Sequence, residues 1–128
     1  AARYMAEHGG GSILNLTSIG GIQAGGGVQT YRASKAAVIQ MTQALALEWA
    51  FKGIRVNAIA PSITDTPLAQ NLLSTPEKIE ANAQRHPLKQ IGAPSDAAHL
   101  VAFLLGEQSR WMTGQILSLD GGMSAIRS

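Results

Sequence analysis

The sequence predicts an α/β fold with a parallel sheet, and two features indicate it. Three short apolar runs, at residues 12–17, 54–60 and 115–119, have the composition of buried strands. A long helix-forming segment, residues 31–51, separates the first two runs. A strand, a helix and a second strand make a βαβ unit, which implies parallel strands joined by a right-handed crossover.

The N-terminal segments fit this order. Residues 1–8 look like the end of a helix, which the glycines at 9–11 are expected to stop. The apolar, partly β-branched run 12–17 follows as the first strand. Residues 20–27 are small and rich in glycine, which indicates a loop with flexible backbone or with close backbone approach.

The helix at residues 31–51 is apolar around nearly its whole circumference. Its charges are Arg32, Lys35 and Glu48. Such a helix is buried on more than one side, so we expect one face to pack on the sheet and the other on a partner subunit. Gly53 is expected to end it.

The second half of the chain continues the pattern. The strand 54–60 should end at Pro61, because proline cannot donate to the ladder. Residues 68–88, called the flap below, are polar, interrupted by proline and weakly helical. Two interpretations fit them equally well: a mobile segment that covers a cleft, or an ordinary surface loop. The later elements expected are a helix from Pro94 to Gly106, a strand at 115–119 and a turn at 120–122.

Composition narrows the class of protein. The 128 residues suffice for one domain with a moderate core. Only 14% are charged, so some surface is expected to be covered by more chain or by a partner. The net charge of +2 comes from scattered basic residues, which argues against nucleic acid binding. The absence of cysteine excludes disulfides and fits a reducing, cytoplasmic location.

The sequence was also searched for membrane-spanning segments and for a signal peptide. No apolar run reaches membrane-spanning length, so we expect no membrane insertion. The start of the chain lacks both an initiator Met and the apolar core of a signal peptide. We therefore expect the chain to begin inside a longer protein.

Ser18, Tyr31 and Lys35 are the candidate catalytic residues. If Tyr31 opens the helix, Tyr31 and Lys35 lie one turn apart on the same face. A free tyrosine titrates near pH ~10, and a nearby cation lowers that pKa toward neutrality. Ser18 could hold a substrate oxygen by a hydrogen bond without competing for the proton. This set suits proton transfer to or from a carbonyl oxygen, although a structural role is the more common one for such a pair.

The fold prediction brings these residues together. In open parallel sheets, ligands bind beyond the carboxyl ends of the strands. Ser18, the start of the helix that carries Tyr31, and the loop 61–67 all lie at such ends. The sequence therefore predicts one cleft formed by these three segments.

Other chemistries find no support in the motifs. Neither a glycine fingerprint that opens a helix nor a phosphate-binding loop is present. The histidines at 8, 86 and 99 lack the spacing of metal ligands. Ser18 lacks the glycine-flanked elbow of hydrolases.

Several motifs together resemble the short-chain dehydrogenase/reductase family in order and spacing. The resemblance implies a Rossmann-like, doubly wound parallel sheet. Residues 1–128 would be the C-terminal half of that single domain, with about three strands and flanking helices. The N-terminal cofactor-binding half, with its glycine-rich turn and a further catalytic Asn, would be absent. The matching residues are Asn15-Leu16-Thr17-Ser18, Tyr31-Arg32-Ala33-Ser34-Lys35-Ala36-Ala37, Ile54-Arg55-Val56-Asn57-Ala58-Ile59-Ala60-Pro61, Thr113-Gly114-Gln115 and Asp120-Gly121-Gly122.

The resemblance also implies roles. Tyr31 would be the catalytic acid/base, Lys35 would lower its pKa and hydrogen-bond the nicotinamide ribose, and Ser18 would orient the substrate oxygen. The backbone at Thr64 would meet the carboxamide of NAD or NADP, with the Thr66 hydroxyl close to the cofactor. The implied cofactor-binding residues are Tyr31, Lys35, Pro61, Thr64 and Thr66.

The implied reaction is hydride transfer between the nicotinamide and a small secondary alcohol or ketone. The sequence is similar to carrier-protein-linked ketoacyl reductases and to polyol or sugar-acid dehydrogenases. A homo-oligomer, dimer or tetramer, is expected through the helix 31–51. The alternative is a non-catalytic half-domain that serves as an oligomerisation or interaction module. One departure is Ser62, where the family usually has glycine; a backbone φ above zero would strain it.

Overall fold

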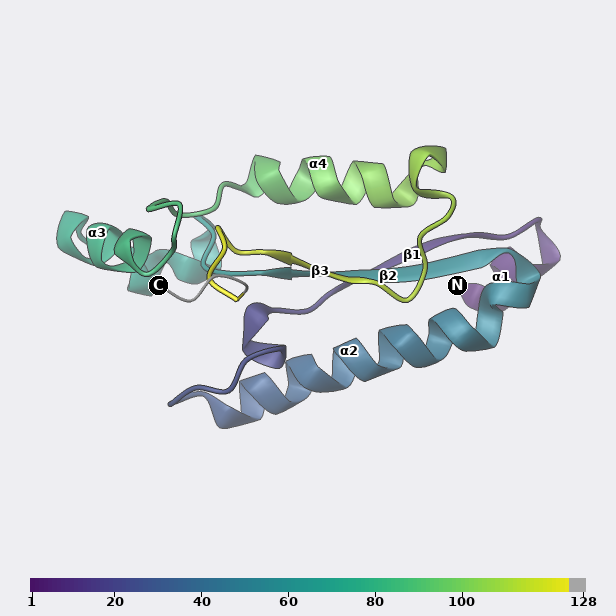
Figure 1. The fold of residues 1–128 in the computed structure, drawn as a ribbon, viewed down its shortest axis with the longest axis horizontal. Coiled ribbons are helices and arrows are strands. Elements are labelled where there is room, and N and C mark those ends of the chain that lie inside the picture. Colours follow the sequence, from purple (N-terminus) through teal and green to yellow (C-terminus); the bar gives the residue numbers. More distant parts are fainter. Residues whose placement is uncertain (125–128) are drawn as a thin grey trace.

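Three parallel strands form one sheet in the order β1-β2-β3 in the computed structural model, which describes residues 1–124. The strands are β1 (Gly11–Leu16), β2 (Ile54–Pro61) and β3 (Ile116–Leu119). Helix α2 (Gln29–Trp49) covers one face of the sheet and helix α4 (Pro94–Leu105) covers the other (Figure 1). The predicted α/β fold, with a parallel sheet wound on both faces, is confirmed.

The middle strand β2 holds the centre of the core. Val56, Ala58 and Ala60 are fully buried. Strand β1 pairs with β2 from Gly11 opposite Ile54 onward, and β3 pairs with the second half of β2. Because β2 is covered on both faces, the run Ala58-Ile59-Ala60 is apolar without alternation, and the polar Arg55 and Asn57 are held by hydrogen bonds.

The N-terminal helix and the long helix begin and end near their predicted positions. Helix α1 (Ala2–Glu7) ends before the glycines at 9–11. Helix α2 begins two residues earlier than predicted and is followed by the 3-10 turn η2 (Ala50–Lys52), which Gly53 ends with a φ of +69°. A Cβ at Gly10 would lie 2.6 Å from the Gly53 carbonyl oxygen, so the two glycines allow close backbone contact.

The outer face of α2 is apolar and exposed. Thr42 and Ala46 are buried against the sheet, whereas Met41 and Leu47 are exposed, Leu47 by 84%. Phe51, just beyond the helix, is exposed as well. Exposed apolar side chains are therefore present beside the exposed Gln40, Gln43 and Glu48, and the partner subunit that they suggested remains a prediction.

The flap is helical. It contains the 3-10 helix η3 (Pro67–Leu72) and helix α3 (Pro76–Gln84), which lies beyond the carboxyl end of the sheet (Figure 1). The Thr75 hydroxyl caps α3 by accepting a hydrogen bond from the Lys78 amide at 3.3 Å. A hydrogen bond from the Thr75 side chain also lowers the pKa of Glu77 below its ordinary value.

Helix α4 begins as predicted. The Asp96 carboxylate accepts a hydrogen bond from the Ala93 amide at 2.8 Å, which satisfies a free donor at the start of the helix. The helix ends at Gly106 and is followed by the 3-10 turn η4 (Glu107–Ser109). Within residues 1–124, no helix combines the length and the apolar character that a membrane crossing requires.

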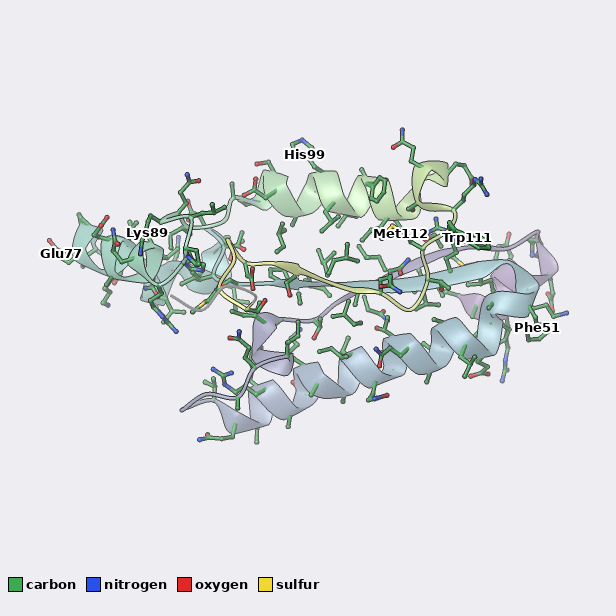
Figure 2. The ribbon with its side chains drawn as sticks, viewed as in Figure 1. Phe51, Glu77, Lys89, His99, Trp111 and Met112 are labelled. Carbon is green, nitrogen blue, oxygen red and sulfur yellow. The ribbon has the colours of Figure 1, made fainter. Side chains whose placement is uncertain are left out.

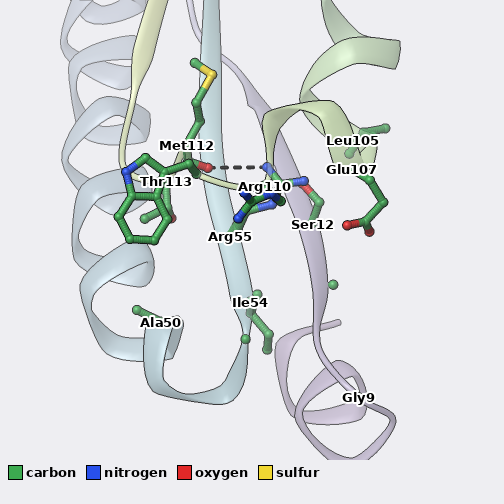
Figure 3. Close-up of a pocket in the computed structure, with 13 residues that line it drawn as sticks. Gly9, Ser12, Ala50, Ile54, Arg55, Leu105, Glu107, Arg110, Met112 and Thr113 are labelled. Atoms are coloured by element: carbon green, nitrogen blue, oxygen red, sulfur yellow. Dashed lines mark hydrogen bonds between the residues drawn. The ribbon is translucent and has the colours of Figure 1, made fainter.

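Arg55 fixes the amino-terminal end of the sheet. Its guanidinium donates to the carbonyl oxygens of Leu104 at 3.0 Å, Gly106 at 3.1 Å and Met112 at 3.3 Å. These contacts tie the end of α4 to β2, and they border a cavity of about 590 Å³ (Figure 3). Trp111 lines this cavity and lies with Phe51 at the end of the molecule opposite α3 (Figure 2).

Asn57 fixes β3 against β2. Its side chain is fully buried and donates to the Met112 carbonyl oxygen at 2.9 Å. Its Oδ1 accepts from the Gln115 amide at 3.0 Å. The residue thus satisfies two backbone groups of the turn that leads into β3, which makes this motif residue a structural one.

We expect Asn57→Ala to destabilise the protein by about 2–4 kcal/mol, because two backbone groups would lose their buried partners. The measurement is urea unfolding of the complete natural protein, followed by circular dichroism. Gln115→Ala is the matched control, since that side chain is exposed and contacts only the turn itself. Equal stability of the two variants would contradict the role assigned to Asn57.

Candidate active site

Three segments meet at the carboxyl end of the sheet. Ser18 follows β1, the loop 62–66 follows β2, and α2 begins at this same end (Figure 1). Helix α2 starts here because it runs back against the direction of the parallel strands. The three segments lie at the carboxyl end of the sheet, as predicted. The single cleft that they were expected to form stays a prediction, because the cavity at this end is lined by Ser62 and His86 and not by Ser18 or Tyr31.

Ser18 and Tyr31 both lie close to Gly20. The Ser18 Oγ accepts a hydrogen bond from the Gly20 amide at 3.0 Å and caps the 3-10 turn η1 (Ile19–Gly21). A Cβ at Gly20 would lie 3.4 Å from Ser18 Oγ and 3.6 Å from Tyr31 Cε1. Because a hydroxyl that accepts one bond can still donate its own proton, Ser18 has a donor for a further partner.

Tyr31 and Lys35 lie one turn apart on the same face of α2, as predicted. The Lys35 Nζ is 5.7 Å from the centre of the Tyr31 ring. It also donates to the Leu16 carbonyl oxygen at 3.2 Å, which joins the helix to the end of β1. The Tyr31 ring is 46% exposed, so the phenol is open to a ligand from outside.

Thr17 and Gly21 hold this part of α2 against β1. The buried Thr17 hydroxyl donates to the Lys35 carbonyl oxygen at 2.7 Å, and its amide donates to the Ile59 carbonyl oxygen at 2.9 Å. A Cβ at Gly21 would lie 2.7 Å from the Lys35 carbonyl carbon, which is closer than real contacts allow. Sequence reasoning gave neither residue a role of its own, because it placed Thr17 inside the predicted strand 12–17 and Gly21 in the glycine-rich loop.

Arg32 fixes the glycine-rich loop. Its Nη1 donates to the Gln23 carbonyl oxygen at 2.7 Å, and a Cβ at Gly25 would lie 2.6 Å from its Nη2. The neighbour of Gly25 is thus the end of a side chain, so the close backbone approach offered for these glycines does not apply there. Val28 precedes the helix with a φ of +43°, a left-handed conformation that strains a β-branched residue.

The loop after β2 is closed by its own hydrogen bonds. The Thr64 hydroxyl donates to the Ser62 carbonyl oxygen at 3.2 Å, and the Thr66 hydroxyl donates to the Thr64 carbonyl oxygen at 3.4 Å. Thr64 forms a parallel bridge with Gly92, and Pro61 still pairs with Leu119 in the sheet. Of the three predicted cofactor-binding residues of this segment, Pro61 therefore ends β2, and Thr64 and Thr66 lie in the hydrogen-bonded loop that follows.

The strain considered for Ser62 is absent. Among residues 1–124, the residues other than glycine with positive φ are Val28 and Lys89. The backbone at Ser62 does not need the left-handed region, and its amide donates to the Leu119 carbonyl oxygen at 3.0 Å as an extension of the sheet. A serine therefore fits here without backbone cost.

His86 is a site residue that sequence reasoning missed. It is only 3% exposed, and its Nε2 lies 2.8 Å from the Ser62 Oγ. Both residues line a cavity of about 400 Å³, together with Ile91 and Asp120. The signal in the sequence was a serine at the position where the resembled family has glycine, but nothing in the sequence identified its partner.

Comparisons with known proteins agree with this geometry. A family model described as "Enoyl-(Acyl carrier protein) reductase" matches residues 1–124. The 3-oxoacyl-[acyl-carrier-protein] reductase FabG of Thermotoga maritima is 42% identical over 121 residues, which cover 94% of this chain and 48% of that protein. The chain spans about half the length of the curated relatives it matches.

Solved structures have the same fold. A putative gluconate dehydrogenase from Agrobacterium tumefaciens has a TM-score of 0.93 and 35% identity, covering 99% of this chain and 50% of that one. A gluconate 5-dehydrogenase from Burkholderia cenocepacia, in complex with NADP and tartrate, has a TM-score of 0.92 and 29% identity over 98% of this chain and 49% of that one.

We expect Gly21→Ala to lower the unfolding free energy of the complete protein by about 1–3 kcal/mol, because the added methyl group would collide with the α2 backbone. Gly26→Ala is the matched control, since a Cβ there meets nothing within 4 Å. The midpoints of urea unfolding measure both changes. A Gly21→Ala variant as stable as Gly26→Ala would show that the close approach is not a constraint.

Proposed function

Because the chain belongs to the short-chain dehydrogenase/reductase family, we propose that it takes part in hydride transfer between a nicotinamide cofactor and a secondary alcohol or ketone. The observation that carries the proposal is the placement of Ser18 and Tyr31 close to Gly20, with the Lys35 ammonium one helical turn away. A hydroxyl, a phenol and a cation at the open end of a parallel sheet suit the handling of a carbonyl oxygen.

The protein's own groups would handle the proton and the substrate oxygen. Ser18 hydrogen-bonds the oxygen and orients it. Tyr31 donates its phenolic proton to that oxygen in the reductive direction and takes it back in oxidation. Lys35 stabilises negative charge on the phenolic oxygen, because its ammonium lies on the same face of α2.

NAD or NADP is the proposed cofactor, and the donor set fits it. Lys35 uses one of its three N–H donors on Leu16, which leaves donors for ribose hydroxyls. Pro61, at the end of β2, and Thr64 and Thr66, in the loop after it, would hold the nicotinamide. When bound, the nicotinamide supplies or accepts the hydride. Support comes from the Burkholderia cenocepacia enzyme, whose structure contains NADP.

We further propose that residues 1–128 form the C-terminal part of one doubly wound domain. The matched relatives are about twice as long, and β1 is an edge strand of the three-stranded sheet. Residues that bind the rest of the dinucleotide would then belong to a preceding half whose strand pairs with β1. Activity would require both halves.

A second candidate function is an oligomerisation or interaction module without catalysis. The exposed apolar face of α2, with Met41 and Leu47, favours it. This face serves either function, since a homodimer or tetramer formed through α2 would cover it in an active enzyme too.

Tyr31→Phe separates the two candidates. We expect turnover of the complete protein to fall about 10²- to 10⁴-fold, because the proton donor is lost. Cofactor binding, measured by fluorescence titration with NADPH, should be retained. Tyr4→Phe, on the exposed helix α1, is the control and should leave turnover unchanged. Full activity in Tyr31→Phe would remove Tyr31 from proton transfer.

Leu47→Glu tests the interface. We expect it to shift the complete protein toward smaller species in size-exclusion chromatography with light scattering, because a charge would enter a buried apolar contact. Leu68→Glu, on exposed η3, is the control and should leave the mass unchanged. An unchanged mass for Leu47→Glu would place the interface elsewhere.

A further inference from the structure

Ser62 and the buried His86 form a contact between the end of β2 and the flap. We propose that this hydrogen bond is a positioning contact, which fixes the flap, residues 68–88, against the loop that follows β2. The consequence for substrate binding rests on the proposed function, whereas the contact and its effect on the flap do not.

The hydrogen-bond partners settle the direction of the contact. The His86 Nδ1 lies 2.9 Å from the Asn82 carbonyl oxygen, which can only accept, so Nδ1 carries the proton. In the neutral ring, Nε2 is then an acceptor, and the Ser62 hydroxyl donates to it at 2.8 Å. The imidazole is therefore held at both ends, by α3 on one side and by the end of β2 on the other.

Packing shields the imidazole, although Ser62 and His86 also line the cavity of about 400 Å³. His86 is almost fully buried, and a Cβ at Gly121 would lie 3.3 Å from the His86 Cβ. The Ser62 hydroxyl also has the Met123 Sδ at 3.6 Å as a second, weaker acceptor. Removal of the hydroxyl would take away the protein partner of Nε2, which is costly because the ring is buried.

Asn82 links the Ser62–His86 contact to the rest of the flap, because it bonds to His86 and also to Leu72. The Asn82 Nδ2 donates to the Leu72 carbonyl oxygen at 3.0 Å, which ties the end of η3 to α3. Helix α3 lies beyond the sheet and has few contacts with α2 or α4 (Figure 1). Because other packing is sparse, a single buried hydrogen bond has a large share in fixing the position of these helices.

The segment that follows His86 supplies further hydrogen bonds between the flap and the rest of the protein. The Leu88 amide donates to the Gly121 carbonyl oxygen at 3.2 Å, and the Gly92 amide donates to the Ile63 carbonyl oxygen at 3.2 Å. These bonds hold the base of the flap. The Ser62–His86 contact thus acts on the part that extends over the open end of the sheet, and we assign His86 as a positioning residue.

The test is hydrogen–deuterium exchange of the complete natural protein, read on the amides of α3 and α4. Ser62→Ala should speed exchange in α3 about tenfold, as expected for one buried hydrogen bond, and leave α4 unchanged. Ser62→Thr keeps the hydroxyl and should restore slow exchange. Ser118→Ala, on β3, is the matched control and should leave α3 unchanged.

A second pair of variants tests the same contact from the His86 side, in case Ser62→Ala does not fold. His86→Gln should speed exchange in α3, whereas His99→Gln, on the exposed surface of α4, should not. Unchanged α3 exchange in Ser62→Ala and His86→Gln would overturn the proposal, and so would an equal rise in α3 and α4, which would mean general destabilisation.

Steady-state kinetics test the consequence for substrate separately. In an active protein, Ser62→Ala should raise KM for the substrate several-fold with a smaller change in kcat, because the flap is displaced rather than the proton donor. An unchanged KM would overturn the link to substrate binding. Hydrogen–deuterium exchange does not depend on catalysis. The exchange result therefore tests the Ser62–His86 contact even if the protein is not an oxidoreductase.

Discussion

The close contact between the end of β1 and the first turns of α2 determines the arrangement of the candidate active site. The Thr17 hydroxyl holds the Lys35 carbonyl, Lys35 in turn holds the Leu16 carbonyl, and Gly21 gives the two backbones room to meet. Together these interactions set the rotation and height of α2 relative to Ser18. Two hydrogen bonds and one missing side chain therefore define where the phenol of Tyr31 lies.

The central strand β2 positions the loops that follow the three strands. Strand β2 pairs on both sides, so the loops after all three strands reach the same edge. Asn57 fixes the turn into β3, and Arg55 fixes the end of α4. The motif residues of β2 therefore act on the site indirectly, by holding neighbouring elements, while chemistry is left to the segments beyond the strand ends.

The strands, the long helix and their meeting point were predictable, because apolar runs, glycine stops and the geometry of parallel sheets are local or general signals. The start of α2 was predicted two residues late, because the left-handed Val28 leaves no pattern in the sequence. The roles of Gly21 and His86 depend on distances between residues far apart in the chain. No periodicity or propensity reports such distances, so these residues emerged only in three dimensions.

The outer edge of β1 has a consequence for handling the protein. Among the described residues, the backbone groups on this edge face away from β2 and pair with no further strand. A polypeptide limited to these residues would present them, beside the exposed Leu16, as a template for strands from other molecules. Aggregation during expression, rather than weak secondary structure, would be its main failure, and co-expression with a pairing strand would be the remedy.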